Sequence, residues 1–152
     1  MIERVRFAPK APFPRKVAKK ACIREGLAFE ADAQLAIDKM KPLTATAYHS
    51  QWLEYYSHGQ KYHAQPDLFI LGQGVLWIFE MKLRHTPRSA KQLSMYGELL
   101  SLLYPGKTIK LVEVYKYWDW VTYPAETITL TEEELFSNWA TDAVGLFHKG
   151  VQ

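Results

Sequence analysis

The chain has 152 residues, of which 48% are hydrophobic, 14% aromatic and 23% charged. This length fits one domain spanning residues 1–152, and the composition supplies a core and argues against a disordered chain. The only cysteine, Cys22, excludes an internal disulfide and a cysteine-based zinc site. No long apolar run lacks charges and no apolar segment follows the basic N-terminus, so we expect no membrane span, no secretory signal and a cytoplasmic location.

The net charge of +3 conceals a basic N-terminus. Residues 1–24 carry eight basic residues and one acidic residue, Glu3, which gives this segment a charge of +7 and leaves −4 for the rest. Prolines at positions 9, 12 and 14 predict an extended arm over residues 1–15. Such an arm on a slightly acidic body is typical of a polyanion binder, although a solvated tail has the same composition. The basic residues are Arg4, Arg6, Lys10, Arg15, Lys16, Lys19, Lys20 and Arg24.

Residues 15–40 have helical spacing, and Pro42 ends the run. Gly26 lies inside it at a cost of about 1 kcal/mol relative to alanine, which favours a close approach to its backbone. Glu30 lies in the apolar stripe one turn later. It is either a carboxylate for a site beside the sheet or a marginal residue with its head in solvent.

Strand and helix patterns alternate over the rest of the chain. Residues 72–74, Gly-Gln-Gly, predict a tight hairpin turn, and Thr131 with three following glutamates has capping-box spacing. The order predicts an α/β sandwich with one central sheet. The expected strands are Gln51–Tyr56, Asp67–Leu71, Gly74–Leu83 and Thr108–Tyr117, and the expected later helices are Pro87–Tyr104 and Thr131–His148.

Two charged residues share one face of the strand 74–83. Side chains alternate along a strand, so Glu80 and Lys82 follow Leu76 and Ile78 on the same face. Burying both charges costs several kcal/mol per ion unless they are paired or bind a metal. Glu-x-Lys is common on its own, and a simple ion pair at a strand end also explains it.

The hairpin turn brings a second acid to the same place. If the turn has two residues, Gly72 pairs with Val75, and the same register puts Asp67 opposite Glu80. Opposed Cβ atoms lie about 4.5–5.5 Å apart, where two carboxylates repel each other. Mg²⁺ or Mn²⁺ removes this repulsion, because these cations prefer carboxylate oxygens and water as ligands.

Further polar residues have two interpretations each. Gln92 and Tyr96 lie one turn apart on the stripe of the helix 87–104 that faces the sheet, as a polar pair or as ordinary packing. Arg84 and His85, just after Lys82, are phosphate contacts or plain loop residues. The aromatic and basic segment 52–63 either contacts nucleic acid or supplies the aromatics of an edge strand.

Four motifs together resemble the PD-(D/E)XK nuclease superfamily, specifically its RecB-like branch, which includes phage lambda exonuclease. The resemblance covers about residues 24–116 and includes the order of helices and strands. Each motif is weak alone, but four in this order are a more specific signal. The motifs are G-x-x-x-E at Gly26–Glu30, Pro66-Asp67, Glu80-Met81-Lys82 and Q-x-x-x-Y at Gln92–Tyr96.

The resemblance implies roles for individual residues. Asp67 and Glu80 would bind Mg²⁺ or Mn²⁺, with the Met81 carbonyl in the inner shell and Glu30 assisting directly or through water. Lys82 would orient or activate the attacking water and stabilise charge on the scissile phosphate.

The resemblance also implies a restriction-endonuclease-like three-layer sandwich. In that fold, helices flank a central mixed four-stranded sheet in an αβββαβ core, and the C-terminal helix is appended to this core. The Q-x-x-x-Y residues Gln92 and Tyr96 would hold the site and touch the DNA backbone. With the basic residues nearby and in the arm, the expected DNA-binding set is Gln92, Tyr96, Arg84, Arg88, Lys16, Lys19, Lys20 and Arg24.

The expected activity is metal-dependent hydrolysis of DNA phosphodiester bonds, by an exonuclease of phage-type recombination and DNA metabolism, in the host cytoplasm if the chain is phage-encoded. One alternative is a structure-specific endonuclease such as a Holliday-junction resolvase, which the small size and the basic arm favour. Another is a non-catalytic DNA-binding module with the same fold. A resolvase should be a symmetric dimer and a ring-forming exonuclease a cyclic homo-oligomer, and a recombination protein partner stays open.

Overall fold

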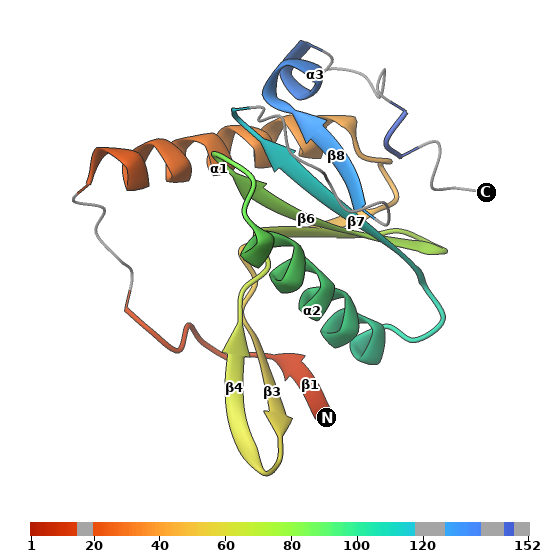
Figure 1. Ribbon diagram of the computed structural model, residues 1–152. Helices are drawn as coiled ribbons and strands as arrows, with labels where there is room; N and C mark the ends of the chain where they lie inside the picture. Colours follow the sequence, from red (N-terminus) through yellow and green to blue (C-terminus); the bar gives the residue numbers. More distant parts are fainter. Residues whose placement is uncertain (15–19, 118–126, 138–144, 148–152) are drawn as a thin grey trace.

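The computed structural model describes residues 1–14, 20–117, 127–137 and 145–147, and shows a helix-covered central sheet with a smaller sheet beside it (Figure 1). The central sheet has five strands in the order β2-β5-β6-β7-β8. β5 is antiparallel to both of its neighbours, whereas β7 is parallel to both of its own, so the sheet is mixed. The strands are β2 (Thr46–His49), β5 (Leu68–Leu71), β6 (Val75–Lys82), β7 (Thr108–Tyr115) and β8 (Thr127–Thr131).

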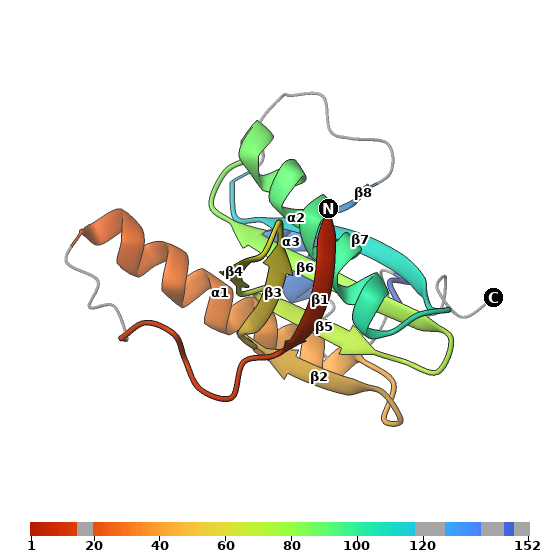
Figure 2. The ribbon, with the colours of Figure 1, turned by 90° about the horizontal axis from the view of Figure 1, so that it is seen from below.

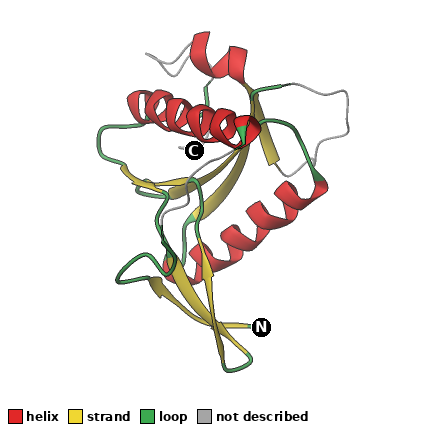
Figure 3. Ribbon diagram, turned by 90° about the vertical axis from the view of Figure 1, so that its left-hand side faces the viewer, coloured by secondary structure: helices red, strands yellow, loops and turns green. Residues whose placement is uncertain are grey.

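Two long helices cover opposite faces of this sheet (Figure 3). On one face Trp77 and Phe79 of β6 pack with the buried side of α1 (Ala21–Met40). On the other face Ile78 packs with the buried side of α2 (Pro87–Leu103). This division follows from the alternation of side chains along β6, whose two faces are both apolar. The protein is therefore an α/β sandwich.

Three antiparallel strands form the smaller sheet, in the order β1-β3-β4 (Figure 2). Its strands are β1 (Ile2–Phe7), β3 (Leu53–Ser57) and β4 (Gln60–Ala64). His58 and Gly59 make the turn between β3 and β4, and both have positive φ, 52° and 76°. A two-residue turn of this kind fits the right-handed twist of a hairpin.

The start of the chain differs from the expected extended arm. Residues 2–7 form β1, because Val5 and Phe7 pack against the apolar cluster that contains Leu53. The first helix begins at Ala21 rather than at residue 15, since Lys20 has extended backbone angles. Residues 15–19 lie outside the described ranges.

The strand expected at Gln51–Tyr56 corresponds to β3, which lies in the smaller sheet. In the central sheet, β2 is the strand that pairs with β5 on the side away from β6. β8 adds a strand at the other edge, so the central sheet has five strands instead of four. Sequence patterns missed β2, β4 and β8, which are only four or five residues long.

The C-terminal helix is also shorter than expected. α3 spans Glu132–Ser137 and begins with the predicted capping box, in which the Glu134 backbone N–H donates to Thr131 Oγ1 at 3.2 Å. Residues 145–147 form a turn rather than helix, and His148 lies outside the described residues. Among the helices that the structure describes, none is both long and apolar enough to cross a membrane.

Candidate functional site

The candidate site lies where β5 begins and β6 ends. Leu68 pairs with Phe79 and Leu71 with Leu76, and one further step in this register places Asp67 opposite Glu80. The Gly72 N–H donates to the Val75 carbonyl at 2.9 Å, which closes the turn. The register predicted from the sequence is therefore confirmed. Gly72 is required there, because a Cβ on it would lie 2.9 Å from the Trp77 ring.

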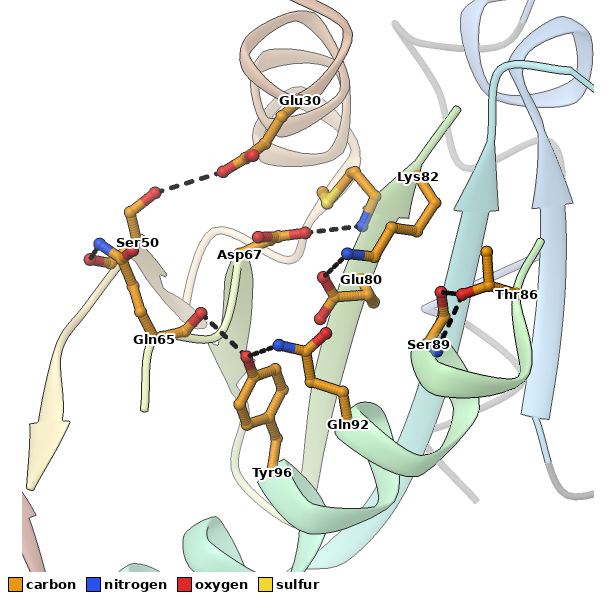
Figure 4. A network of polar contacts seen from close by, with 11 residues as sticks. Glu30, Ser50, Gln65, Asp67, Glu80, Lys82, Thr86, Ser89, Gln92 and Tyr96 are labelled. Atoms are coloured by element: carbon orange, nitrogen blue, oxygen red, sulfur yellow. Dashed lines mark hydrogen bonds and ion pairs between the residues drawn. The ribbon is translucent and has the colours of Figure 1, made fainter. Parts of the chain in front are cut away.

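Hydrogen bonds hold Asp67 in place from both sides. Its Oδ2 accepts from the Met81 backbone N–H at 2.8 Å (Figure 4). Its carbonyl oxygen accepts from Gln34 Nε2 at 2.6 Å and from the Ser50 N–H at 3.0 Å. The N–H and C=O of a strand residue point to the same side, so the Met81 carbonyl also points toward the β5 side of the strand.

Glu80 is almost completely buried, with 3% of its surface exposed. Its Oε1 lies 3.4 Å from Lys82 Nζ, and the Lys82 side chain is 38% exposed, so the ammonium lies at the open edge of the site. Glu80 Oε2 has no hydrogen-bond partner among the residues that the structure describes. A buried carboxylate oxygen without a partner is costly, which favours a ligand at this atom.

Both opposed carboxyls resist ionisation. Burial, followed by the adjacent Glu80 carboxylate, raises the pKa of Asp67 well above its ordinary value. Burial also raises the pKa of Glu80, whereas its contacts with Asp67 and Lys82 oppose this shift. Two such carboxylates fit a hard divalent cation, which offsets their repulsion and accepts the unpartnered oxygen as a ligand. No third His, Cys, Asp or Glu within the described ranges completes a ready-made cluster, so water and main-chain oxygens would fill the remaining positions.

Glu30 reaches the site from α1, beside Asp67 (Figure 4). Burial, followed by the charge of Asp67, raises the pKa of Glu30 to about 7. Its Oε1 lies 3.5 Å from Ser50 Oγ, the residue that also holds the Asp67 carbonyl. Gly26 does not serve a close approach, since a Cβ on it would lie 4.0 Å from Leu83, an ordinary contact.

Gln92 and Tyr96 lie on the opposite side of the site, on α2. Gln92 Nε2 donates to the Tyr96 hydroxyl at 2.8 Å, and that hydroxyl donates to the Gln65 carbonyl at 3.2 Å. Tyr96 is 3% exposed, and burial raises its pKa. Tyr96 thus attaches α2 to the loop before Asp67, a positioning contact, while the less buried Gln92 is the member of the pair nearer to solvent.

The expected basic residues have mixed positions. Arg84 is exposed just beyond Lys82, with its guanidinium 5.0 Å from the centre of the Tyr117 ring, and Arg88 is exposed in the first turn of α2. Lys20 and Arg24 are exposed at the start of α1, and the six residue steps from Arg24 to Glu30 span about 9 Å of helix. Lys16 and Lys19 lie outside the described residues.

A buried cluster on β7 was not anticipated from the sequence. Glu113 pairs with Glu80 across the parallel strands and is 1% exposed. His85 Nδ1 lies 3.4 Å from Glu113 Oε2 and 2.6 Å from the Tyr115 hydroxyl. Burial raises the pKa of Glu113, and the contact with His85 opposes this. The segment 108–115 carries an acid after an apolar run, as 75–82 does, but only the strand register shows that the two acids are neighbours.

We expect the cation-free protein to lose stability as the pH rises from 5.5 to 8. The folded pKa values of Asp67, Glu80 and Glu30 lie above their ordinary values, so the folded state holds protons that the unfolded chain releases. The contribution of Glu30 to the free energy of unfolding is complete below about pH 4 and is lost as the pH passes its folded pKa of about 7, and the raised pKa values of Asp67 and Glu80 act in the same direction. Mn²⁺ should therefore raise the melting temperature more at pH 8 than at pH 5.5, which differential scanning fluorimetry measures.

Glu30→Gln is the control for this pH dependence, because it removes a group whose pKa is about 7 and should reduce the slope between pH 6 and 8. The carboxylates of Glu25 and Glu54 titrate outside the window, since contacts with Lys116 and Arg6 respectively lower their pKa values. An equal effect of Mn²⁺ at both pH values would contradict the prediction.

Comparison with known proteins gave no match to a family model, a curated protein or a solved structure.

Proposed function

We propose that the chain is a metal-dependent nuclease that hydrolyses DNA phosphodiester bonds. The observation that carries the proposal is the opposition of Asp67 and Glu80 at the end of β6, with Lys82 next on the same face. With β3 and β4 inserted between β2 and β5, the elements α1, β2, β5, β6, α2 and β7 occur in the αβββαβ order, which supports a restriction-endonuclease-like core. The four motifs that resemble the PD-(D/E)XK superfamily support the same assignment.

Asp67 and Glu80 would hold Mg²⁺ or Mn²⁺, the Met81 carbonyl would complete the inner set, and Glu30 would assist from α1. A divalent cation supplies charge for the phosphate oxygens and lowers the pKa of water, which is the chemistry that phosphodiester hydrolysis needs. The protein supplies the geometry. Gln34 and Ser50 fix the Asp67 backbone, and the Met81 N–H fixes its side chain.

Lys82 has a different task. Its ammonium is partly exposed and lies beside Glu80, so it can contact both a phosphate oxygen and the attacking water. In that position it stabilises negative charge as the phosphorus gains its fifth oxygen. Arg84 and Arg88, which follow along the chain, would bind flanking phosphates.

An exonuclease is the activity that the Q-x-x-x-Y pair favours, through the resemblance. The basic arm favours a resolvase, but β1 places residues 2–7 of that arm in a sheet, which weakens this support. Cleavage of different DNA substrates separates an exonuclease from an endonuclease directly.

The test incubates the protein with linear duplex, linear single-stranded, nicked circular and four-way-junction DNA, in Mg²⁺, Mn²⁺ or EDTA. We expect cleavage that EDTA abolishes, and loss of cleavage in Glu80→Gln. Glu98→Gln is the matched control, because it removes the same charge from an exposed position on α2. A well-folded wild type that binds DNA without cutting any substrate would refute the nuclease and leave a DNA-binding module.

A further inference from the structure

The smaller sheet, β1-β3-β4, has two different faces. Val5, Phe7, Leu53 and Tyr55 point to the face that packs against α2 and the central sheet. Because side chains alternate, their neighbours share the opposite face, and the strand pairings align them in adjacent rows. This outward face carries Arg4, Arg6, Glu54, Tyr56, Lys61 and His63.

The outward face is basic. Glu54 is buried, at 3% exposure, and it makes ion pairs with Arg6 and with Lys61, whose Nζ lies 3.8 Å away. Glu3, at the bulge of β1, lines the same pocket as Arg4 and Arg6, so three permanent cations over two carboxylates leave an excess of one positive charge among the described residues of this face. The Arg4 guanidinium lies 4.2 Å from the centre of the Tyr56 ring, which holds that cation at the surface.

Aromatic rings gather at the end of this face that is nearest the site. The centre of the Phe13 ring lies 5.6 Å from that of Trp52 and 5.9 Å from that of His63. Phe13 is 57% exposed, so this cluster contributes an aromatic surface to solvent and not only to the core. Large exposed rings beside cations are typical of surfaces that stack unpaired bases.

The strands β3 and β4 of the smaller sheet are connected directly to the candidate site. Ser50, which holds both Glu30 and the Asp67 backbone, lies two residues before Trp52, and β4 ends three residues before Asp67. Gln65 Nε2 donates to the Ser50 carbonyl at 2.8 Å and closes this junction. From the junction the β3–β4 hairpin extends away from the central sheet (Figure 1). A chain that leaves the site along this hairpin passes the aromatic cluster first and then the cations.

We propose that the outward face of β1-β3-β4 binds a single-stranded segment of the DNA substrate, with an unpaired base stacked on the Phe13–Trp52–His63 cluster and phosphates on Arg4 and Lys61. The proposal rests on the function above for the position of the reacting phosphate. β3 is about 17 Å long at the usual rise of a strand, which is room for a few nucleotides. The charge of the face, opposite to that of DNA, and its exposed ring select this occupant.

The first test measures binding of fluorescein-labelled dT20 by fluorescence anisotropy in EDTA, where no cleavage can occur, over a range of salt concentrations. Arg4→Gln with Lys61→Gln should weaken binding about ten-fold near 0.1 M salt, and should reduce the slope of log K against log salt by about 1.4, or about 0.7 for each single-strand phosphate contact. Lys39→Gln with Lys110→Gln is the matched control, since it removes two positive charges from α1 and β7. The control should keep the wild-type slope.

The second test is Phe13→Ala, an exposed position where a folding defect is not expected. It should weaken dT20 binding by about five-fold or more, as removal of a base-stacking ring does, while binding of a blunt 20-base-pair duplex stays unchanged. An equal loss of affinity for duplex and for single-stranded DNA would refute the preference for single strands. No loss of dT20 affinity in either variant would refute the outward face of β1-β3-β4 as the binding surface.

These binding results are independent of the nuclease assay. A wild type that cleaves DNA, with variants of the outward face of β1-β3-β4 that bind dT20 as the wild type does, removes this inference and leaves the proposed function. A wild type that never cleaves, with variants that lose dT20 binding, has the opposite meaning: the nuclease is refuted and the outward face of β1-β3-β4 stands as a nucleic-acid surface.

Discussion

Asp67→Asn should reduce DNA cleavage by about 1000-fold or more and should raise the melting temperature of the protein in EDTA. Asparagine has the shape of aspartate and keeps an oxygen to accept the Met81 N–H, so the loop before β5 stays in place. What is lost is the negative charge that would hold the cation. A loss of about 4 kcal/mol of transition-state stabilisation corresponds to about 1000-fold in rate.

The gain in stability has the same origin as the loss of activity. Burial and the adjacent Glu80 raise the pKa of Asp67, so at pH 8, where the unfolded chain has this carboxyl ionised, Asp67 destabilises the cation-free fold. Asparagine removes that charge without creating a cavity. We expect a gain on the order of 1 kcal/mol, which shifts the melting temperature by about 2–4 °C in a domain of this size.

Asp32→Asn provides the control, because Asp32 is exposed on α1. It should change neither the cleavage rate nor the melting temperature in EDTA. Cleavage of linear DNA and scanning fluorimetry with and without Mn²⁺ measure both effects on one preparation. If Asp67→Asn retained a tenth of the wild-type rate, or if its melting temperature fell, Asp67 would be a structural residue and not a cation ligand.

The opposition of Asp67 and Glu80 could be derived from the sequence because strand geometry has a period of two. A Gly-Gln-Gly turn fixed which residues of β5 and β6 face each other, and one slip would have moved Asp67 to the other face. The start of α2 and the end of α1 could also be predicted from the sequence. Pro87 begins α2 at a position where proline is favoured, and a proline at residue 42 follows the end of α1.

The smaller sheet shows where local patterns failed. β4 reads Gln-Lys-Tyr-His-Ala, mostly polar because its outward face meets solvent, and it has no apolar alternation to mark it. The pair His58-Gly59 could have indicated this hairpin. Glycine readily adopts the positive φ that a two-residue hairpin turn requires, and the pair lies between two short aromatic segments. In β1, the prolines that follow at 9, 12 and 14 obscured the apolar positions Val5 and Phe7.

The position of Glu113 opposite Glu80 could not be predicted from the sequence, for a different reason. Its position opposite Glu80 depends on a parallel pairing between β6 and β7, and the register of a parallel pair is set by the packing of the intervening helix rather than by a turn. α2 connects these strands and packs on β7 at Gly97, where an added Cβ would contact Leu111 at 3.4 Å. No short-range rule relates residues 80 and 113 before that packing is known.

Lys82→Met should reduce cleavage by about 100- to 1000-fold and move the remaining activity to higher pH. Methionine keeps the unbranched apolar stem and removes the ammonium that lies 3.4 Å from Glu80 Oε1. The first effect follows because charge on the phosphate loses a partner, at a cost of about 3–4 kcal/mol.

The pH effect follows from the three carboxyls. Burial raises the pKa values of Glu30, Asp67 and Glu80, and in each the charge of Lys82 opposes the rise. Without the ammonium the three pKa values rise further, so the carboxylates that would hold the cation form only at higher pH. The limb of the rate profile between about pH 6 and 8 should therefore shift upward, and part of the lost rate should return near pH 9.

Cleavage rates from pH 6 to 9.5 at saturating Mn²⁺ test both effects, with Lys91→Met as the control at an exposed lysine of α2. Lys82→Arg separates charge from shape: it keeps the positive charge and so should keep the wild-type pH limb, but its larger planar head should still lower the rate. A Lys82→Met profile that is reduced uniformly, with no displacement toward high pH, would mean that Lys82 acts on the substrate alone and does not tune the carboxyl groups beside it.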